Sequence, residues 1–156
     1  MDYSEKWQGK ALWAARAAEN SVTPYAEVAA FHVKFGLLPE RAAPLERSMA
    51  RKRADQMREE LREFEDACAD GDAAKAVDAL CDMVYFAYGA ACMMGVAPKC
   101  WEQCWTAVHL ANMSKERVPG LDTLKQGIVK PKGWQSPEAA VREALKGEGF
   151  FKEAER

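Results

Sequence analysis

Hydrophobic and polar residues along this chain repeat with the spacing of α-helices, and alternating β-branched runs bounded by turn residues are nearly absent. Thr23 followed by Pro24 is typical of a helix start, and Gly36 is typical of the end of that helix. Residues 118–135 have the composition of a loop. Further helices are predicted over 4–19, 45–69, 72–95, 98–115 and 136–146. The predicted fold class is therefore all-α, a bundle of about four core helices.

The helix predicted over 72–95 is apolar on nearly every side after residue 82. A helix of this kind lies at the centre of a fold, covered by its neighbours or by another subunit. Three or four short neighbours are too few to cover it, so we expect a homodimer or homotetramer whose second subunit completes the bundle. The 156 residues are otherwise expected to form one domain, with its core in 22–117 and a tail with a short helix in 118–156.

Composition narrows the class of protein. The 22 basic and 24 acidic residues are nearly balanced, which argues against a sequence-blind nucleic-acid binder. The longest uncharged run, 83–98, is shorter than the roughly 20 apolar residues of a membrane span. Five cysteines without a signal peptide indicate reduced thiols, and Cys100 and Cys104 have no second Cys/His pair to form a zinc site. We therefore expect a cytoplasmic protein with no membrane or nucleic-acid partner.

The segment MREELREFED, residues 57–66, carries five acidic side chains. Each helical residue turns by about 100°, which places Glu60 at the edge of an apolar stripe, with Glu63 and then Glu59 further round the helix. Glu65 and Asp66 are expected to be solvated. The apolar stripe consists of Met57, Leu61, Phe64 and Cys68.

Two further acids lie on the apolar helix 72–95. Asp78 and Asp82 are four residues apart and therefore share one face of that helix. Burying two like charges together is unfavourable unless a cation or a proton neutralises them. A single EExxE pattern is usually a charged solvent face. The edge position of Glu60, together with this second acidic pair, favours a metal site instead.

The predicted helix 98–115 carries a stripe that begins apolar and ends polar. By itself, the stripe is explained by a Lys115 side chain that extends to solvent and an Asn112 that helps to end the helix. Beside four or five converging carboxylates, an amide and an ammonium group also suit an anionic, metal-bound ligand, and Mg²⁺ prefers carboxylates plus phosphate oxygens. No nucleophilic triad or Gly-rich phosphate loop is evident. The stripe consists of Trp101, Trp105, Val108, Asn112 and Lys115.

At these positions the sequence resembles the MazG-like all-α nucleoside triphosphate pyrophosphohydrolases, which include the phosphoribosyl-ATP pyrophosphohydrolases. The matching segments stand in the family's order over roughly residues 22–140. The combination of DALxD with NMSK is most similar to the small single-domain members common in phages and bacteria. The segments are FHVKFG (31–36), REELREFEDA (58–67), DALCDMVYFAYGAACMMGV (78–96), NMSK (112–115) and KPKGW (130–134).

This resemblance implies Mg²⁺-dependent hydrolysis of a (deoxy)nucleoside triphosphate between its α- and β-phosphates, with Mn²⁺ able to replace Mg²⁺. It implies metal ligands at Glu59, Glu60 and Glu63 and at a later acidic pair, usually ExxD. Asp82 matches the final Asp of that pair. Ala79 stands where the family has Glu, so the other ligand is either Asp78 or water.

The resemblance also implies roles for individual side chains. Glu59 or Glu63 would take a proton from the attacking water. Asn112, Lys115 and, more weakly, Lys130 would contact phosphate or sugar. His32 would line a nucleoside pocket with Phe35 or pack in the core, and Tyr85 would contact base or sugar or likewise belong to the core.

Three functions remain open at the level of sequence. The first is a nucleotide pyrophosphohydrolase that cleans or shapes a nucleotide pool, in the host cytoplasm if phage-encoded. The second is a phosphoribosyl-ATP pyrophosphohydrolase, whose compact type fits the N-terminal segment and long tail less well. The third is a non-catalytic helical interaction module, which has no need of five acids around a core. Base and sugar specificity and the number of metal ions are not determined.

Overall fold

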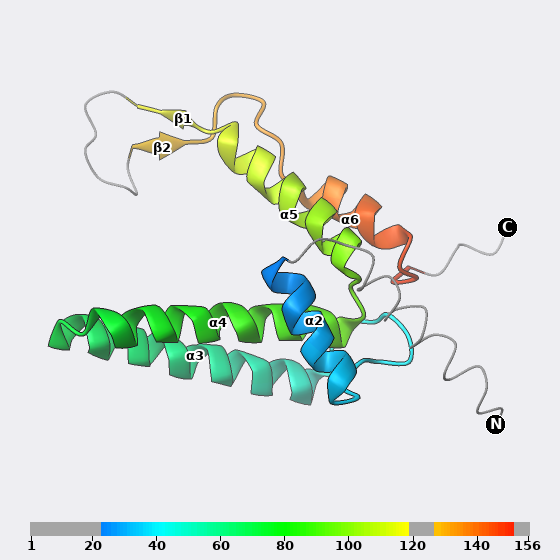
Figure 1. The fold of residues 1–156 in the computed structure, drawn as a ribbon. Coiled ribbons are helices and arrows are strands. Elements are labelled where there is room, and N and C mark those ends of the chain that lie inside the picture. Colours follow the sequence, from blue (N-terminus) through cyan, green and yellow to red (C-terminus); the bar gives the residue numbers. More distant parts are fainter. Residues whose placement is uncertain (1–22, 119–126, 152–156) are drawn as a thin grey trace, which may run out of the picture. The chain divides into compact units, whose positions relative to one another are not determined.

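The computed structural model describes residues 23–118 and 127–151 (Figure 1). Within these ranges the chain forms five helices and one pair of two-residue strands, which confirms the all-α prediction. The helix predicted over 4–19 lies outside the described residues. The elements are α2 (Pro24–Lys34), α3 (Arg47–Asp70), α4 (Ala73–Met94), α5 (Pro98–Met113), β1 (Glu116–Arg117), β2 (Ile128–Val129) and α6 (Glu138–Lys146).

The helix ends follow from local sequence. The hydroxyl of Thr23 accepts a hydrogen bond from the backbone N–H of Ala26 at 3.2 Å, and the carboxylate of Asp72 caps α4 in the same way. Gly36 and Gly71 end α2 and α3 with positive φ angles of 66° and 70°. The start of α3 was predicted two residues early, because no side chain caps its first turn.

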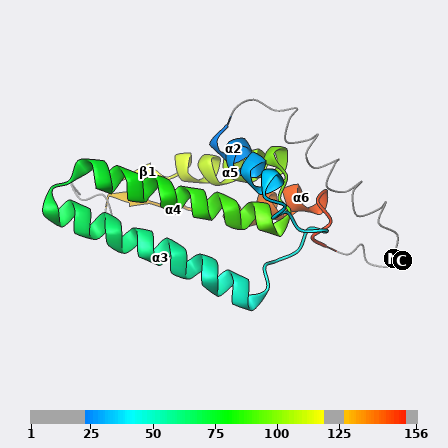
Figure 2. The same ribbon diagram turned by 60° about the horizontal axis from the view of Figure 1, so that its bottom comes forward.

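Helices α3 and α4 form a long antiparallel hairpin, and α2 crosses the C-terminal half of α4 (Figures 1 and 2). The buried face of α2 supplies Tyr25, Val28 and Ala29 to the core. The phenol of Tyr25 donates a hydrogen bond to the carbonyl of Val96, just beyond α4, at 2.7 Å. The C-terminal half of α4 is therefore fixed on two sides, by α3 and by α2.

The loop after α2 packs tightly against the end of α4. The backbone N–H of Ala43 donates to the carbonyl of Met94 at 3.0 Å. Gly95 follows with a φ of 87°, and a Cβ atom there would lie 2.9 Å from the Cα of Ala42. Only glycine meets both requirements at this position.

We expect Gly95→Ala to lower the free energy of unfolding by about 3 kcal/mol, because the added methyl group combines positive-φ strain with a backbone clash. Gly36→Ala is the matched control: its φ is 66°, but a Cβ there meets nothing within 4 Å. It should lose only about 1 kcal/mol. Urea unfolding of both variants measures the difference, and equal losses would contradict the tight packing of this loop.

The N-terminal half of α4 is uncovered in the single chain. Val77, Leu80 and Val84 are 60%, 42% and 46% exposed. The described neighbouring helices leave this face open, as expected from their small number. The alternative, that a second subunit covers it, stays a prediction. By length and composition α4 could cross a membrane, a test that a soluble helix with such an apolar face also passes.

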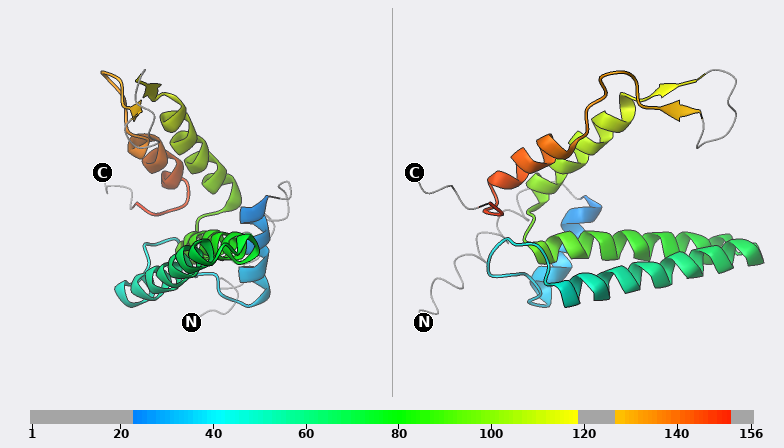
Figure 3. Two further views of the ribbon diagram at one scale, coloured as in Figure 1. Left: turned by 90° about the vertical axis from the view of Figure 1, so that its left-hand side faces the viewer. Right: turned by 180° about the vertical axis from the view of Figure 1, so that it is seen from behind.

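The chain divides into two compact units, Met1–Pro98 and Lys99–Arg156. Almost all of α5 therefore groups with the tail, whereas the sequence placed it in the core of 22–117. Its packing partners explain this: the thiol of Cys100 donates to the carbonyl of Ala144 in α6 at 3.4 Å, and α6 lies alongside α5 (Figure 3). Trp105 is 58% exposed, so the prediction that its stripe begins in the core is wrong there.

The loop predicted over 118–135 contains part of a short ribbon. Strand β1 pairs antiparallel with β2, with Glu116 opposite Val129 and Arg117 opposite Ile128. The backbone N–H of Val118 extends the pairing by donating to the carbonyl of Gly127 at 2.8 Å. Strands of two residues are too short to produce an alternating sequence pattern, so these strands could not be predicted.

Candidate active site

The face that α3 turns toward α4 is rotated from the predicted stripe. Met57 and Phe64 are half-buried as expected, but Leu61 is 45% exposed and Cys68 is also exposed. Glu60 is half-buried, since it lies between Met57 and Phe64 on the same face. The predicted stripe was wrong at Leu61 and Cys68, and Glu60 lies closer to α4 than the edge position predicted for it.

Arg53 accounts for this rotation. Its guanidinium donates to the sulfur of Met93 at 2.9 Å and lies 5.9 Å from the centre of the Phe86 ring, both on α4. An arginine can bury its methylene stem while its charged end finds polar or aromatic partners. Arg53 therefore belongs to the face of α3 that packs against α4, although a sequence pattern of apolar residues does not include an arginine. The packed face consists of residues 53, 57, 60, 64 and 67.

Four carboxylates lie within electrostatic reach of Glu60 where α3 faces α4. Burial raises the pKa of the Glu60 carboxyl above its usual value, and repulsion from Glu63, Asp82, Glu59 and Asp78, in that order, raises it further. Two of these four acids belong to α3 and two to α4, so negative charge reaches Glu60 from both helices. We refer to these five residues as the acidic cluster.

Over residues 23–118 and 127–151, no lysine or arginine forms an ion pair with a member of the acidic cluster. Four of its members are exposed to solvent, and Glu60 is half-buried. The charge gathered between the two helices is therefore available to a bound cation. In the described part of the chain, the ion pairs lie elsewhere: Arg58 with Asp55, Lys75 with Asp72, and Lys146 with Glu143.

The chemistry of the acidic cluster fits a hard divalent cation. Mg²⁺ takes carboxylate, phosphate and water oxygens and needs only one or two carboxylates directly. Over residues 23–118 and 127–151, no three His, Cys, Asp or Glu side chains stand close enough together to hold a metal ion. Exposed acidic side chains can change rotamer to close on a cation, and the repulsion that raises the pKa of Glu60 would then be relieved.

Asp78 and Ala79, the two α4 positions compared with the missing family glutamate, differ in burial. Ala79 is only 3% exposed and packs in the core. Asp78 is exposed on the same face as Asp82, and both repel the Glu60 carboxylate. Asp78 therefore belongs to the acidic cluster.

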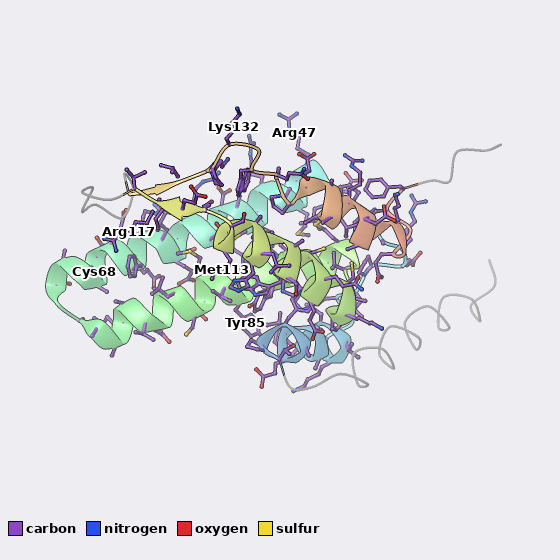
Figure 4. All side chains as sticks on the ribbon, turned by 90° about the horizontal axis from the view of Figure 1, so that it is seen from above. Arg47, Cys68, Tyr85, Met113, Arg117 and Lys132 are labelled. Carbon is purple, nitrogen blue, oxygen red and sulfur yellow. The ribbon has the colours of Figure 1, made fainter. Side chains whose placement is uncertain are left out.

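An exposed aromatic patch adjoins the acidic cluster along α4. Tyr85 lies three residues after Asp82 and is 38% exposed (Figure 4). Its ring contacts Phe31 edge-on, with centroids 5.7 Å apart, and Phe31 contacts Phe35 at 4.6 Å. Phe31 and Phe35 are 40% and 54% exposed. These three rings, which we call the aromatic patch, could accept a flat apolar or aromatic group.

His32 packs in the core. It is 2% exposed, and its Nδ1 donates a hydrogen bond to the carbonyl of Val28 at 2.8 Å. Among the described residues its Nε2 has no hydrogen-bond partner, and it faces Gly89, where an added Cβ would lie 3.3 Å away. Burial lowers the pKa of His32, and the nearby Arg53 lowers it further. Of the two alternatives for this residue, the structure favours core packing over nucleoside contact.

The other residues assigned to the substrate lie in the second unit, with Asn112 and Lys115 at the end of α5 and Lys130 just after β2. The amide of Asn112 donates to the carbonyl of Val108 at 2.9 Å, and its oxygen accepts from the Lys115 ammonium at 2.7 Å. The Lys130 ammonium lies 4.3 Å from the centre of the Trp134 ring. Asn112 thus orients Lys115, and Trp134 orients Lys130.

Two shallow cavities lie along α5 within the second unit, with volumes of about 490 and 500 Å³. One is lined by the C-terminal half of α5 and by residues 131–137, and the other by residues such as Lys99 and Gln103. Neither is lined by a member of the acidic cluster. The chemistry of the side chains, and not the size of a cavity, identifies the candidate active site.

An all-α fold in which two antiparallel helices present neighbouring acids resembles the MazG-like pyrophosphohydrolases, although this chain has DxxxD where the family usually has ExxD. The chain belongs to the phosphoribosyl-ATP pyrophosphohydrolase family of that superfamily: the family's sequence model matches residues 28–112, more than half of the chain. A search of curated proteins found no match. The family match confirms the resemblance seen in the sequence and identifies a hydrolase of the pyrophosphohydrolase type.

Sequence reasoning missed two residues near the candidate site. Phe31 was not singled out, although its spacing of four residues from Phe35 places both rings on one face of α2. Arg53 was overlooked because a charged residue at the start of a stripe is normally solvated. The first could have been found from spacing, whereas the second required the structure.

Proposed function

We propose that the protein is a Mg²⁺-dependent nucleotide pyrophosphohydrolase that cleaves a (deoxy)nucleoside triphosphate between the α- and β-phosphates. The products are the nucleoside monophosphate and pyrophosphate. The observation that carries the proposal is the acidic cluster, in which two helices set four carboxylates around Glu60 and raise its pKa. Mn²⁺ substitutes for Mg²⁺, since it accepts the same oxygen ligands.

The members of the acidic cluster have distinct roles in this proposal. Glu60, held between the helices, is a metal ligand with Asp78 and Asp82. The cation supplies neutralisation of phosphate charge and an attacking water of lowered pKa. Glu59 and Glu63 are further ligands, and whichever lies outside the tightest coordination accepts the proton of that water. Their exposure on α3 supports this assignment.

The base, sugar and phosphates of the substrate are assigned to residues outside the acidic cluster. Tyr85 contacts the base or sugar, which is supported by its exposure and by its place one turn beyond Asp82. Aromatic faces accept bases by stacking, and this tolerates any base. Asn112, Lys115 and Lys130 contact phosphates, which is supported by their polar chemistry and by the contacts that orient them.

Phosphoribosyl-ATP is the second candidate substrate. The matching family carries that activity in its description, and the match includes the whole acidic cluster. Both candidates share one reaction, the release of pyrophosphate, so the acidic cluster does not distinguish them. A non-catalytic helical module is the third alternative. It accounts least well for the acidic cluster, whose five carboxylates form no ion pairs with basic side chains of the described residues.

The activity test is an assay of pyrophosphate release. We expect at least one of the common NTPs, dNTPs or phosphoribosyl-ATP to yield its monophosphate and pyrophosphate in millimolar Mg²⁺ or Mn²⁺, and none to react in excess chelator. If phosphoribosyl-ATP is the only compound hydrolysed, the protein is a phosphoribosyl-ATP pyrophosphohydrolase, the second candidate. Orthophosphate with a diphosphate as products, or full activity in chelator, would refute the proposed reaction.

We also propose that the protein acts in the cytoplasm, without a membrane or nucleic-acid partner. In this proposal it forms a homodimer or homotetramer. Support for self-association comes from the uncovered face of α4, where Val77, Leu80 and Val84 are 42–60% exposed. Exposed apolar faces of this kind are normally covered by a partner. A second copy offers the same face and makes a closed, symmetric interface.

Light scattering at micromolar concentration should therefore give a mass of two or four times 17.4 kDa. Leu80→Glu on the uncovered face should shift the protein toward the monomer, because it places a charge in the interface. Lys75→Glu, an exposed change on the same helix, is the control and should leave the mass unchanged. A wild-type mass of 17.4 kDa would contradict the self-association.

A further inference from the structure

The buried imidazole of His32 has one ring nitrogen without a hydrogen-bond partner. His32 is 2% exposed, and its Nδ1 lies 2.8 Å from the carbonyl oxygen of Val28, one turn earlier on α2. Because a carbonyl only accepts hydrogen bonds, Nδ1 carries the proton of the neutral ring and Nε2 carries a lone pair. Among the described residues Nε2 has no partner. Protonation would therefore add a buried N–H for which these residues supply no acceptor.

Gly89 of α4 and Arg53 of α3 border the side of the ring that carries Nε2. A Cβ atom added at Gly89 would lie 3.1 Å from Cε1 and 3.3 Å from Nε2 of the imidazole. The Nη1 atom of Arg53 lies 4.0 Å from the same point. The Arg53 guanidinium donates to Met93 and Gln56, which are uncharged, and forms no ion pair within the described ranges. A protonated His32 would thus stand beside an arginine whose charge no carboxylate offsets.

Burial and this neighbouring positive charge oppose protonation of His32. Burial lowers its pKa most and the charge of Arg53 lowers it further, whereas the bond to the Val28 carbonyl acts in the opposite direction. The acidic cluster lies two helical turns away along α3 and α4. The other titratable groups of α2 and of the adjoining part of α4 are Glu27 and Lys34, both exposed, and Tyr85, Tyr88 and Cys92, which are uncharged in acid.

The contact of His32 with Gly89 is one of a few that dock α2 on the C-terminal half of α4 (Figure 2). Another is the hydrogen bond from the phenol of Tyr25 to the carbonyl of Val96. A third is the edge-on contact between Phe31 of α2 and Tyr85 of α4. Because α2 carries two of the three rings of the aromatic patch, the patch exists only while α2 is docked.

We propose that His32 is a pH-sensitive latch: uptake of a proton at Nε2, beside Arg53 and Gly89, releases α2 from α4. Release exposes the ring to water, which solvates its charge. The pKa of His32 has its ordinary value of 6.5 when the ring is exposed and a lower value when α2 is docked. The latch therefore holds above about pH 6.5 and weakens as the pH falls below that value. Acid would thus separate Phe31 from Tyr85 and take the aromatic patch apart.

Hydrogen exchange of the full chain at pH 5 and pH 7.5, followed by mass spectrometry, tests the latch. After correction for intrinsic exchange rates, acidification should reduce the protection of α2 amides at least about threefold more in the wild type than in His32→Asn. The asparagine amide replaces Nδ1 as donor to the Val28 carbonyl but takes up no proton. His109→Asn removes the chain's other histidine, exposed on α5, and should behave as the wild type.

Nuclear magnetic resonance of the wild type gives a second measurement that needs no variant. As the His32 ring takes up its proton, the nuclear Overhauser contacts between Phe31 and Tyr85 should disappear while the amide signals of α3 and α4 remain. The latch is overturned if these contacts persist once His32 is protonated, or if acid reduces the protection of α2 equally in the wild type and His32→Asn. Neither measurement uses a substrate, so neither result depends on the proposed function.

Discussion

Asp82→Asn should reduce turnover about a thousandfold, equivalent to about 4 kcal/mol of transition-state stabilisation. The substitution removes one charge from the acidic cluster and nearly preserves side-chain shape. Because Asp82 repels the Glu60 carboxylate in the metal-free protein, its neutralisation should leave the melting temperature in chelator equal to or above that of the wild type. Loss of activity together with unchanged or higher stability indicates a functional acid.

The same variant should lose most of the stabilisation by metal. A cation bound only by the folded state contributes RT ln(1 + [L]/Kd), about 2.7 kcal/mol at a hundredfold excess over Kd. For a chain of this size the melting temperature of the wild type should rise by roughly 5–10 °C in Mg²⁺. Asp66→Asn, an exposed acid of α3, is the control and should keep both activity and the rise. Equal shifts in wild type and Asp82→Asn would mean that Asp82 is not a ligand.

Glu60→Gln should abolish turnover and change how the stability of the metal-free protein depends on pH. The folded state raises the pKa of Glu60 above its unfolded value of about 4.5. The unfolded chain therefore releases this proton first as pH rises, so the stability associated with protonated Glu60 is lost from about pH 4.5 upward. A glutamine has no proton to lose, so the variant should be more stable than the wild type at neutral pH.

Urea unfolding in chelator at pH 4 and pH 7.5 measures this effect. The gain from Glu60→Gln should appear at pH 7.5 and shrink toward zero at pH 4. Glu65→Gln, exposed on the other side of α3, should show no such dependence on pH. A gain of the same size at both pH values would show that Glu60 is not strained by its acidic neighbours.

Much of the fold follows from local rules that the sequence displays. Thr23, Asp72, Gly36 and Gly71 end or begin helices through hydrogen bonds and positive φ angles that depend only on a few adjacent residues. The pairing of α3 with α4 could also be predicted, since both helices carry acids and apolar residues at helical spacing. That acids of both helices lie on the facing sides follows from this pairing and the 3.6-residue period.

Other features depend on contacts between residues distant in sequence. Arg53 takes a packed position through Met93 and Phe86 of α4, and no pattern within α3 reveals this. The short ribbon forms because the chain returns from β1 to β2, and two residues in each strand leave no periodicity to detect. The burial of His32 depends on the absence of a side chain at Gly89. In each case a contact with a residue distant in sequence determines the local structure.

The central claim is that the acidic cluster binds a divalent metal ion. Its most direct test is to titrate the metal-free protein with Mn²⁺ and to monitor binding by calorimetry and by electron paramagnetic resonance. The account predicts saturable binding to the wild type, at least tenfold weaker binding to Glu60→Gln and Asp82→Asn, and unchanged binding to Glu65→Gln and Asp66→Asn. If Mn²⁺ fails to bind the wild type, with or without pyrophosphate, or binds all four variants as tightly as the wild type, the acidic cluster is not a metal site.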